Sequence, residues 1–307
     1  MIPCYNVEKY LAKSISSVIR QKDPRCDLKI IVFDNQSSDA TFKIAQQFQA
    51  EYPTQVQVFQ NLENRGPAFS INRCWEKSVS EFNILLHSDN ELIDGALSLF
   101  IDYIESGNYK RGIIFGDIEY IDLAGNSIGS WTGEHLGEGP LSNKHLIENY
   151  IDKNGSRLRP LQFLLDRKTF LEFGPYSEQF FVDDWEFTIR YLCHADIHRI
   201  NAPIVRFRIR HNSLGHQPEA YSDSLMDVIE LHEKSLFEKF GLKSETIYSN
   251  TLCRIILMFI HKNRASTAIT KFWFYKKKYK NRIKVLEVML FGLTEYLKFK
   301  LKRILSI

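Results

Sequence analysis

The sequence predicts an α/β protein with a mostly parallel central sheet flanked by helices, and a helical extension at its C-terminal end. Two observations support this fold class. Over residues 1–120, short segments rich in Ile, Val and Phe alternate with segments of helical periodicity. From about Tyr221 onward the periodicity is helical only. We therefore expect an α/β domain over residues 1–216 and a helical extension over residues 217–307.

The elements of the first part follow one another in a regular order. The predicted strands cover residues 29–33, 55–59, 82–87 and 112–120, and the predicted helices cover residues 7–21, 39–50, 67–80 and 94–106. Alternating strands and helices favour parallel strands joined by helical crossovers. Because ligands of such sheets bind at the carboxyl ends of the strands, the loops after Phe33, Phe59 and His87 are candidate sites.

The elements after residue 120 are less regular. Residues 122–160 are rich in Gly, Ser and Asn and predict a long loop. The elements predicted after it are a strand at 160–165, a helix at 167–173, a helix at 183–193 and a strand at 204–210. Gly174 and Pro175 end the first of these helices.

Composition excludes several classes of protein. The 307 residues are 44% apolar and 25% charged, which excludes disordered, collagen-like and disulfide-scaffold chains. The five cysteines are scattered without a CxxC pair, so neither a zinc site nor a disulfide framework is predicted, and a reducing cytosol is favoured. We expect no signal peptide, because Glu8 and Lys9 interrupt the first ten residues, and no membrane-spanning helix.

An acidic loop follows the predicted strand at 82–87. Asp89 stands at the carboxyl end of this strand, where a carboxylate suits a hard cation such as Mg²⁺ or Mn²⁺. The alternative is that Asp89 and Asn90 form a turn or cap the next helix. Asp34 occupies the equivalent position after the strand at 29–33, where it could accept hydrogen bonds from a base or a ribose.

A second acidic segment begins the predicted helix at 183–193. Asp183 and Glu186 have the spacing of a capping box, but one cap needs only one of the two adjacent carboxylates Asp183 and Asp184. A helix N-terminus keeps a carboxylate ionised, which is the state that a general base requires. Trp185 offers an apolar face to a sugar ring.

A basic strand lies at 204–210. Alternation places Arg206, Arg208 and Arg210 on one face, where they either bind phosphates or form a solvated surface. His211 follows as a candidate metal ligand or phosphate donor, with a structural role as the alternative.

Taken together, these segments resemble the family 2 glycosyltransferases, which have the GT-A nucleotide-sugar fold. The resemblance covers about residues 1–216. It rests on Pro3-Cys4-Tyr5-Asn6, the loop from Asp34 to Asp39, Asn64-Arg65-Gly66 with Asn72, Ser88-Asp89-Asn90, Gly174-Pro175-Tyr176-Ser177-Glu178, and Asp183-Asp184-Trp185-Glu186. His87 and Asn35 stand where the family has aspartates, and Ile71 stands where it has an arginine.

The resemblance implies inverting transfer of a sugar from a nucleotide-diphosphate donor to a glycan or lipid-linked acceptor, in cell-surface polysaccharide synthesis. It implies a base at Asp184, acceptor contacts at Asp183 and Trp185, and a divalent cation, Mn²⁺ or Mg²⁺, at Asp89 and His211. The implied donor contacts are Pro3, Tyr5, Asn6, Asp34, Asn64, Gly66, Asn72 and Ser88. The rival functions are a non-catalytic nucleotide-sugar- or glycan-binding protein of the same fold, and a nucleotidyltransferase, for which residues 3–10 lack the Gly- and Lys-rich triphosphate loop.

The C-terminal segment is strongly basic. Residues 271–307 carry eleven Lys and Arg against two acidic residues, a net charge of +9, so that the other 270 residues sum to −6. Apolar residues at helical spacing over 283–305, after a basic run at 276–280 with neighbouring aromatic residues, fit an interfacial helix on anionic lipid. The alternative is a helix packed on the rest of the chain with its charges solvated. No recognition motif for nucleic acid accompanies the segment, so we expect no nucleic-acid partner. We expect a cytoplasmic protein, peripheral on the inner face of the cell membrane.

Overall fold

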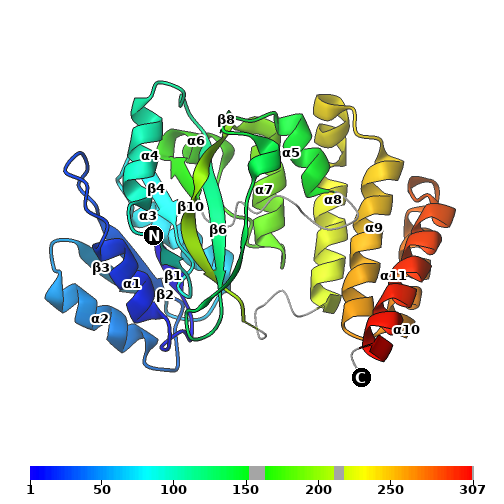
Figure 1. The fold of residues 1–307 in the computed structure, drawn as a ribbon, viewed down its shortest axis with the longest axis horizontal. Helices are drawn as coiled ribbons and strands as arrows, with labels where there is room; N and C mark the ends of the chain where they lie inside the picture. The colour runs from blue at the N-terminus through cyan, green and yellow to red at the C-terminus, as the bar shows by residue number, and fades with distance from the viewer. Residues whose placement is uncertain (152–162, 211–217, 306–307) are drawn as a thin grey trace. The chain divides into compact units, whose positions relative to one another are not determined.

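The structure is a computed structural model, and it describes residues 1–151, 163–210 and 218–305. The chain divides into two compact units (Figure 1). The sheet unit comprises Met1–Asn143, Pro160–Gln179 and His194–His211. The helical unit comprises Lys144–Arg159, Phe180–Cys193 and Asn212–Ile307. Each unit therefore collects segments that are far apart in the sequence.

The first half of the sheet unit is parallel. Strands β1 (Ile2–Cys4), β2 (Ile30–Asp34) and β3 (Val56–Gln60) pair in the order β1-β2-β3. The five residues of β2 are all buried, as expected for a strand that helices cover on both faces. The helices that connect these strands are α1 (Leu11–Ile19), α2 (Thr41–Glu51) and α3 (Pro67–Lys77).

The second half of the sheet unit is mixed. Its strands are β4 (Phe82–Leu85), β9 (Phe163–Asp166), β6 (Ile113–Ile121), β10 (Ile197–Arg208) and β5 (Glu91–Leu92), in that order. Strands β6 and β10 pair in parallel, and the other neighbours are antiparallel. Strand β7 (Ser127–Trp131) extends the sheet beside β6, and β8 (Gly139–Pro140) pairs with β10.

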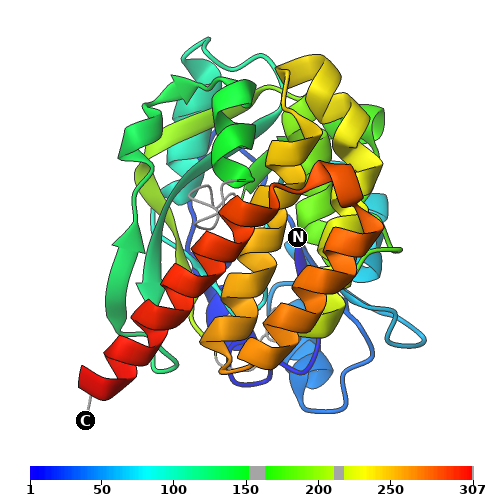
Figure 2. The ribbon, with the colours of Figure 1, turned by 90° about the vertical axis from the view of Figure 1, so that its right-hand side faces the viewer.

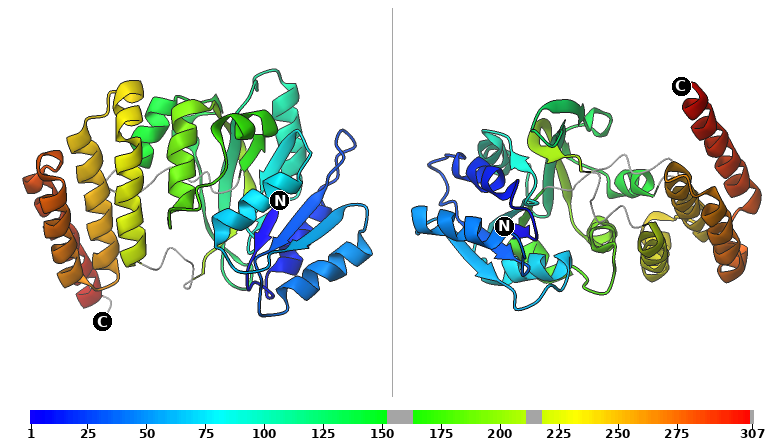
Figure 3. Two further views of the ribbon diagram at one scale, coloured as in Figure 1. Left: turned by 180° about the vertical axis from the view of Figure 1, so that it is seen from behind. Right: turned by 90° about the horizontal axis from the view of Figure 1, so that it is seen from below.

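The two halves meet at β1 and β4. The amino group of Met1 donates to the carbonyl of Ile84 at 2.9 Å, and the amide of Leu86 donates to the carbonyl of Met1 at 3.0 Å. The strand order β3-β2-β1-β4 reverses after β3, so right-handed crossovers put α1 and α2 on one face and α3 on the other (Figure 3). The chain thus leaves β1 and β4 toward opposite faces, which makes the carboxyl ends of these two strands a topological switch point.

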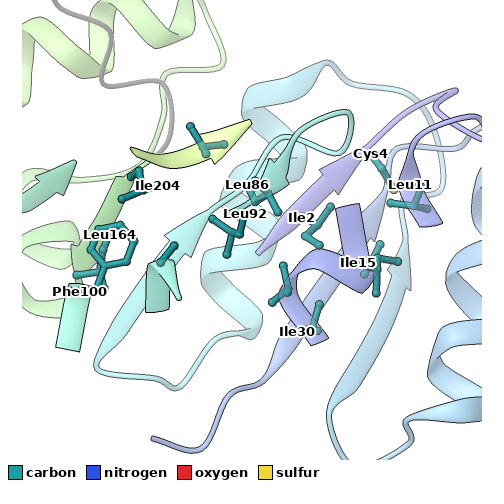
Figure 4. Packing of buried hydrophobic residues seen from close by; sticks show 14 of the residues in the cluster. Ile2, Cys4, Leu11, Ile15, Ile30, Leu86, Leu92, Phe100, Leu164 and Ile204 are labelled. Carbon is teal, nitrogen blue, oxygen red and sulfur yellow. The ribbon is translucent and has the colours of Figure 1, made fainter. Parts of the chain in front are cut away.

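One hydrophobic core runs beneath both halves of the sheet. It includes Ile2, Leu86, Leu92, Leu164 and Ile204, which come from five strands or strand ends (Figure 4). Phe100 of α4 (Ala96–Glu105) packs into the same core. Burial of each such side chain contributes about 1.5–3 kcal/mol, so this core fixes the strands whose ends carry the predicted site.

The helical unit is built around α9 (Ser244–His261). Helix α9 packs against α8 (Pro218–Phe240), α10 (Ala265–Lys278) and α11 (Val285–Leu305), and it lies between α10 and α11 (Figure 2). The unit also contains the first-turn carboxylates of α7 (Asp183–His194) and most of α5 (Asn143–Tyr150). No helix among the described residues is long and apolar enough to cross a membrane.

An acidic stripe on α8 pairs with Arg264, which precedes α10, and with basic residues of α10 and of the short turn η3 (Lys280–Arg282). Successive acidic residues of the stripe are three or four positions apart and so share one helix face. Its ion pairs are Glu219 with Arg264, Asp223 with Lys271, Asp227 and Glu230 with Lys278, and Glu233 with Arg282. Part of the basic charge predicted for the tail is therefore compensated inside the helical unit.

Most predicted elements are present, with two corrections. The predicted loop at 122–160 contains β7, β8 and α5, while residues 152–160 lie outside the described part of the chain. Four of the five residues of β7 are exposed, so no apolar alternation marks this strand. The predicted strand at 204–210 is the second half of the longer β10, whose beginning escaped notice because it buries polar side chains. Arg199 there is paired with Asp117 at 2.7 Å.

Asp166 holds the junction between β9 and α6 (Arg167–Phe173). Its carboxylate accepts hydrogen bonds from the amide and hydroxyl of Thr169, both at 2.7 Å, from the hydroxyl of Tyr109 at 2.8 Å and from the amide of Gly112 at 2.6 Å. Burial raises the pKa of Asp166, but these hydrogen bonds outweigh it and hold the pKa below its usual value. The ionised carboxylate therefore stabilises the fold.

We expect Asp166→Ala to lower the free energy of unfolding by about 3 kcal/mol, because it removes a helix cap and leaves two buried donors unsatisfied. Because the folded-state pKa lies below the unfolded one, the deficit is largest above about pH 4 and shrinks as the pH falls below it. Urea titrations at several pH values measure this difference. Asp27→Ala is the control, since the Asp27 side chain is 80% exposed and its loss should change little. A deficit that does not depend on pH would contradict this role.

Candidate active site

Asp34 ends β2 in a fully buried position. Its Oδ2 accepts hydrogen bonds from the amide of Ser37 at 2.9 Å and from Nε2 of Gln60 at 3.0 Å. Its Oδ1 accepts one from the hydroxyl of Ser37 at 2.5 Å. Both carboxylate oxygens therefore already accept hydrogen bonds from the chain. A base or ribose would donate to the same oxygens, either beside these donors or in place of one of them.

The loop after β1 is fastened to the loop after β2. The amide of Asn6 donates to the hydroxyl of Ser37 at 2.9 Å, and Oδ1 of Asn6 accepts from the amide of Ser38 at 2.9 Å. Asn6 has a φ of 48°, a left-handed conformation that asparagine tolerates better than most residues. Tyr5 is exposed, while Pro3 lies within β1. Four predicted donor contacts, Pro3, Tyr5, Asn6 and Asp34, are therefore brought to one edge of the sheet.

Asn35 organises the loop before α3, a role that the sequence did not reveal. Its Nδ2 donates to Oδ1 of Asn64 at 2.7 Å and to the carbonyl of Gly66 at 3.1 Å. Its Oδ1 accepts from Nδ2 of Asn61 at 2.7 Å and from the amide of Arg65 at 3.3 Å. The signals in the sequence were its position beside Asp34 at a strand end and its place where the family has an aspartate. Asn35 thus places Asn64 and Gly66 next to the end of β2, as the predicted donor site requires.

Asn72 has hydrogen-bond partners within the sheet unit. This buried side chain of α3 donates to the carbonyl of Tyr176 at 2.9 Å and accepts from the amide of Tyr176 at 2.9 Å. Its Nδ2 also donates to Glu178 at 3.1 Å. Asn72 therefore ties residues 174–178 to α3, and donor contact by Asn72 stays a prediction.

Asp89 lies in the loop between β4 and β5 and forms an ion pair. Its Oδ2 lies 2.6 Å from Nε of Arg210, and both side chains are partly buried. The neighbouring Ser88 is buried. The predicted cation ligand is therefore on the carboxyl side of β4, at the switch point beside the end of β1, but it already has a cationic partner from the chain.

Arg208 fixes the backbone of this acidic loop. Its guanidinium is fully buried and donates to the carbonyls of Asp89 at 3.0 Å and of Asp122 at 2.8 Å, and to the carboxylate of Glu91 at 2.5 Å. The amide of Arg208 donates to Oδ1 of Asn90 at 2.9 Å. The sequence placed three arginines on one phosphate-binding or solvated face, and this is wrong for Arg208, because burial among backbone carbonyls removes it from that face.

The residues near Asp89 offer a cation one carboxylate. No group of three or more His, Cys, Asp and Glu suited to a metal occurs among the residues that the structure describes, and His211 lies outside them. A single carboxylate is still compatible with Mg²⁺ or Mn²⁺, because such ions are often held by one or two carboxylates together with substrate phosphates and water. Asp89 therefore fits a cation that arrives with its diphosphate, provided that Arg210 releases the carboxylate.

The acidic pair of α7 belongs to the helical unit. The amide of Asp184 donates to Oδ1 of Asp183 at 2.8 Å, and the amide of Trp185 donates to Oδ1 of Asp184 at 2.9 Å. Asp183 is buried, whereas Asp184 is exposed at its surface. Burial, and then the charge of Asp184, raise the pKa of Tyr150. Both carboxylates lie in the first turn, where the helix dipole favours the ionised form.

Trp185 and Glu186 anchor α7 within the helical unit. The indole of Trp185 is buried against the ring of Tyr150, with centroids 4.4 Å apart, and beneath the guanidinium of Arg254 at 4.3 Å. Its ring is thus covered in this structure, and acceptor contact by Trp185 stays a prediction. Glu186 is buried, but hydrogen bonds from His232 and Arg190 outweigh this burial and lower its pKa to about 2. This network fixes the helix turn that presents Asp184.

A parallel β1–β2–β3 sheet, a switch point beside β4 and polar strand ends form an arrangement that suits nucleotide binding. The model of glycosyl transferase family 2 matches residues 1–170, more than half of the chain, and the chain belongs to this family. The GT-A fold predicted from the sequence is confirmed.

The relatives and solved structures are consistent with this assignment. A minor teichoic acid biosynthesis protein, GgaA of Bacillus subtilis, is 31% identical over 148 residues, which cover 47% of this chain and 30% of GgaA. A β-1,3-glucosyltransferase of Campylobacter jejuni that acts on GalNAc(5)-diNAcBac-PP-undecaprenol is 27% identical over 183 residues, 59% of this chain and 55% of that protein. The chain thus spans less than two thirds of the length of either relative.

The solved structures agree over nearly the whole chain. TarS 1–349 of Staphylococcus aureus in complex with UDP-GlcNAc matches with a TM-score of 0.62 at 14% identity, covering 99% of this chain and 90% of that one. The mannosyltransferase PcManGT of Pyrobaculum calidifontis, in complex with GDP-Man and Mn²⁺, matches with a TM-score of 0.56 at 12% identity, covering 96% and 85%. At these identities the likeness shows the fold.

We expect Asn72→Ala to lower the free energy of unfolding by about 2–3 kcal/mol, because it leaves the buried amide and carbonyl of Tyr176 without their partners. If donor affinity falls, we expect the fall to result from the loss of the contacts between α3 and residues 174–178. Thermal unfolding and donor titration are measured on the same samples, with the exposed Asn108→Ala as the matched control. A variant that unfolds like the wild type but no longer binds donor would show a direct donor contact instead.

Proposed function

We propose that the protein transfers a sugar from a nucleotide-diphosphate donor to a hydroxyl of a glycan or lipid-linked acceptor, with inversion at the anomeric carbon. The observation that supports this most directly is the gathering of Asn6, Asp34, Asn64 and Gly66 at the carboxyl ends of β1 and β2. These residues come from three separate loops, and hydrogen bonds between the loops hold them together. Because the chain belongs to glycosyl transferase family 2, we propose a nucleotide-diphosphate sugar as the ligand of this polar edge.

The donor site that we propose lies at the switch point of the sheet unit. Asp34 and the backbone around Pro3 receive the base and ribose, with Tyr5 exposed beside them. Asn64 and Gly66 stand at the N-terminus of α3, where the helix dipole favours a diphosphate. Ser88 and Asp89 approach the same region from β4. Asn72 supports it indirectly through residues 174–178.

Asp184 is the proposed general base. In single-displacement transfer, the acceptor hydroxyl attacks the anomeric carbon from the face opposite the leaving diphosphate, and its proton passes to a carboxylate. Asp184 lies in the first turn of α7, where the helix dipole favours a negative charge. Single displacement needs no covalent intermediate on this carboxylate. Asp183 and Trp185 are proposed to contribute to the acceptor side, and the buried Glu186 positions this turn.

A divalent cation, Mn²⁺ or Mg²⁺, is proposed to bind at Asp89 together with the donor. Bound there, it would supply charge neutralisation to the departing diphosphate. Arg210 is a second source of positive charge at this carboxylate, because its Nε lies 2.6 Å from Oδ2 of Asp89. We propose that Arg210 holds Asp89 in place before the donor and its cation arrive. His211 is kept as a second proposed ligand on the basis of the family resemblance.

The acceptor class follows from the relatives. The names of the relatives refer to teichoic acid biosynthesis, to an undecaprenol-diphosphate-linked glycan and to poly(ribitol-phosphate). All are cell-surface polymers or their lipid-linked precursors, so we propose an acceptor of this class for a cytoplasmic enzyme.

A non-catalytic nucleotide-sugar- or glycan-binding protein of the same fold is the second candidate. It is favoured by His87 in place of an acidic residue and by the ion pair that engages Asp89. Sugar nucleotides are screened by thermal shift with Mn²⁺ and with EDTA, and every binder is then tested for transfer to lipid-linked and polymer acceptors. A donor that stabilises the protein but is neither transferred nor hydrolysed supports this alternative.

We expect Asp184→Asn to lower the turnover number by at least about 100-fold, because the amide cannot accept the acceptor proton. Donor affinity should stay within a factor of about two. Asp94→Asn serves as the control, since that exposed carboxylate precedes α4 in the sheet unit. Retained turnover in Asp184→Asn would rule out the base assignment.

We expect Asp89→Ala to abolish the dependence of donor binding on Mn²⁺. Arg210→Gln should have the opposite effect and lower the Mn²⁺ concentration needed for half-maximal donor binding by about tenfold, because it removes a competing cation. Isothermal titration of donor at several Mn²⁺ concentrations measures both effects. If Asp89→Ala responds to Mn²⁺ as the wild type does, the cation binds elsewhere.

A further inference from the structure

Helix α11 carries apolar side chains on the face that points away from α9. Its inward face is buried, as Val288 shows, and Gly292 lies close to Ile256 of α9. The outward residues share one helix face and are 49–72% exposed. They are Leu286, the adjacent pair Met289 and Leu290, Leu293, Leu297 and Leu301. A helix that packs on one neighbour buries only one apolar face. The second, exposed apolar face of α11 is therefore a candidate interaction surface.

Helix α10 exposes bulky apolar side chains of its own. Ile269, Trp273 and Phe274 are 61%, 50% and 56% exposed. Trp and Phe are enriched where an apolar phase meets water, because large rings fit that boundary. We call the outward residues of α11 together with these three residues of α10 the apolar face.

Four lysines of α10, η3 and α11 have no acidic partner among the described residues. They are Lys276, Lys277, Lys280 and Lys300, whereas Lys271, Lys278 and Arg282 pair with the acidic stripe on α8. Lys276 lies over the ring of Trp273 at 4.8 Å, and Lys300 over that of Tyr296 at 5.6 Å. Lys284, just before α11, pairs with Glu287, and Lys298 of α11 pairs with Glu295. The unit thus compensates part of its basic charge and leaves the four lysines without an acidic partner.

We propose that the apolar face binds the surface of an anionic lipid bilayer, with α11 lying in the plane of the interface. Leucines that are spread along a helix of 21 residues can insert side by side at one depth. The four lysines without an acidic partner are suited to attract anionic headgroups. A second copy of the chain fits this face poorly, because it would bring the same uncompensated lysines against one another.

This surface deepens the proposed function. An acceptor attached to a lipid lies at a bilayer. A chain bound to the same bilayer would be confined with its acceptor to one membrane surface. The binding itself depends only on α10 and α11, and not on transfer activity. The two proposals therefore fail independently, provided that binding is measured without donor or acceptor.

The test is flotation of the full chain with vesicles of phosphatidylcholine alone or with about one third phosphatidylglycerol at low salt. We expect flotation with the anionic vesicles, and at least about tenfold weaker binding for the double variant Leu293→Glu with Leu297→Glu. A triple variant, Lys276→Gln with Lys277→Gln and Lys280→Gln, should weaken binding and reduce its salt dependence. Leu62→Glu is the matched control, since Leu62 is 98% exposed in the sheet unit.

The outcomes separate the possible occupants of the apolar face. Equal flotation of wild type and the leucine variant, or no flotation of the wild type at low salt, overturns the proposal. A wild-type dimer that the leucine variant converts to monomer, without any vesicle binding, assigns the face to a second copy and also overturns it. Circular dichroism confirms that each variant is folded. Vesicle binding by a protein that transfers no sugar would leave this proposal intact and count against the proposed function alone.

Discussion

The sheet unit depends on the requirement that a buried guanidinium be fully paired. Arg208 is fully buried at the end of β10, where an unpaired charge would cost several kcal/mol. It is satisfied by the carbonyls of Asp89 and Asp122, which come from two different loops, and by the carboxylate of Glu91 in β5. The acidic loop is therefore held by its backbone, and the side chain of Asp89 is left to interact with Arg210 or with a cation. A requirement of folding thus sets the position of a residue proposed for donor binding.

Hydrogen bonds of asparagine side chains hold the loops together at the edge of β1 and β2. Parallel strands place the loops after β1 and β2 next to each other, and Asn6 fastens them. Asn35 then attaches the loop before α3, and Asn72 attaches residues 174–178 to α3. Amides serve here because each offers both a donor and an acceptor and can satisfy backbone groups of either kind. Such an edge is pre-organised, which lowers the entropic cost of binding a flexible nucleotide sugar.

The helical unit separates two uses of positive charge. Along α8, acidic residues three or four apart meet basic residues of α10 and η3, so these cations stabilise the packing of the helices. On the outward side, lysines flank exposed leucines, and their charge remains available for a partner. The net charge of the segment therefore overstates what it can offer to a membrane. The arrangement of the charges, and not their sum, motivates the lipid-binding proposal.

The sequence by itself determined the elements and the class of the protein. Alternating apolar segments and helical periodicity predicted β2, β3, β4 and β6 and the helices between them, because these strands are short runs rich in Ile, Val and Phe. It also predicted which strand ends carry polar residues. Only the tertiary structure decided what those residues touch. Asn35, Asn72 and Arg208 act through partners between 26 and 119 positions away, and no local pattern encodes such contacts. The beginning of β10 and the edge strand β7 were missed for the same reason: buried polar pairs and exposed edges leave no apolar periodicity, and only the neighbouring strands make them part of a sheet.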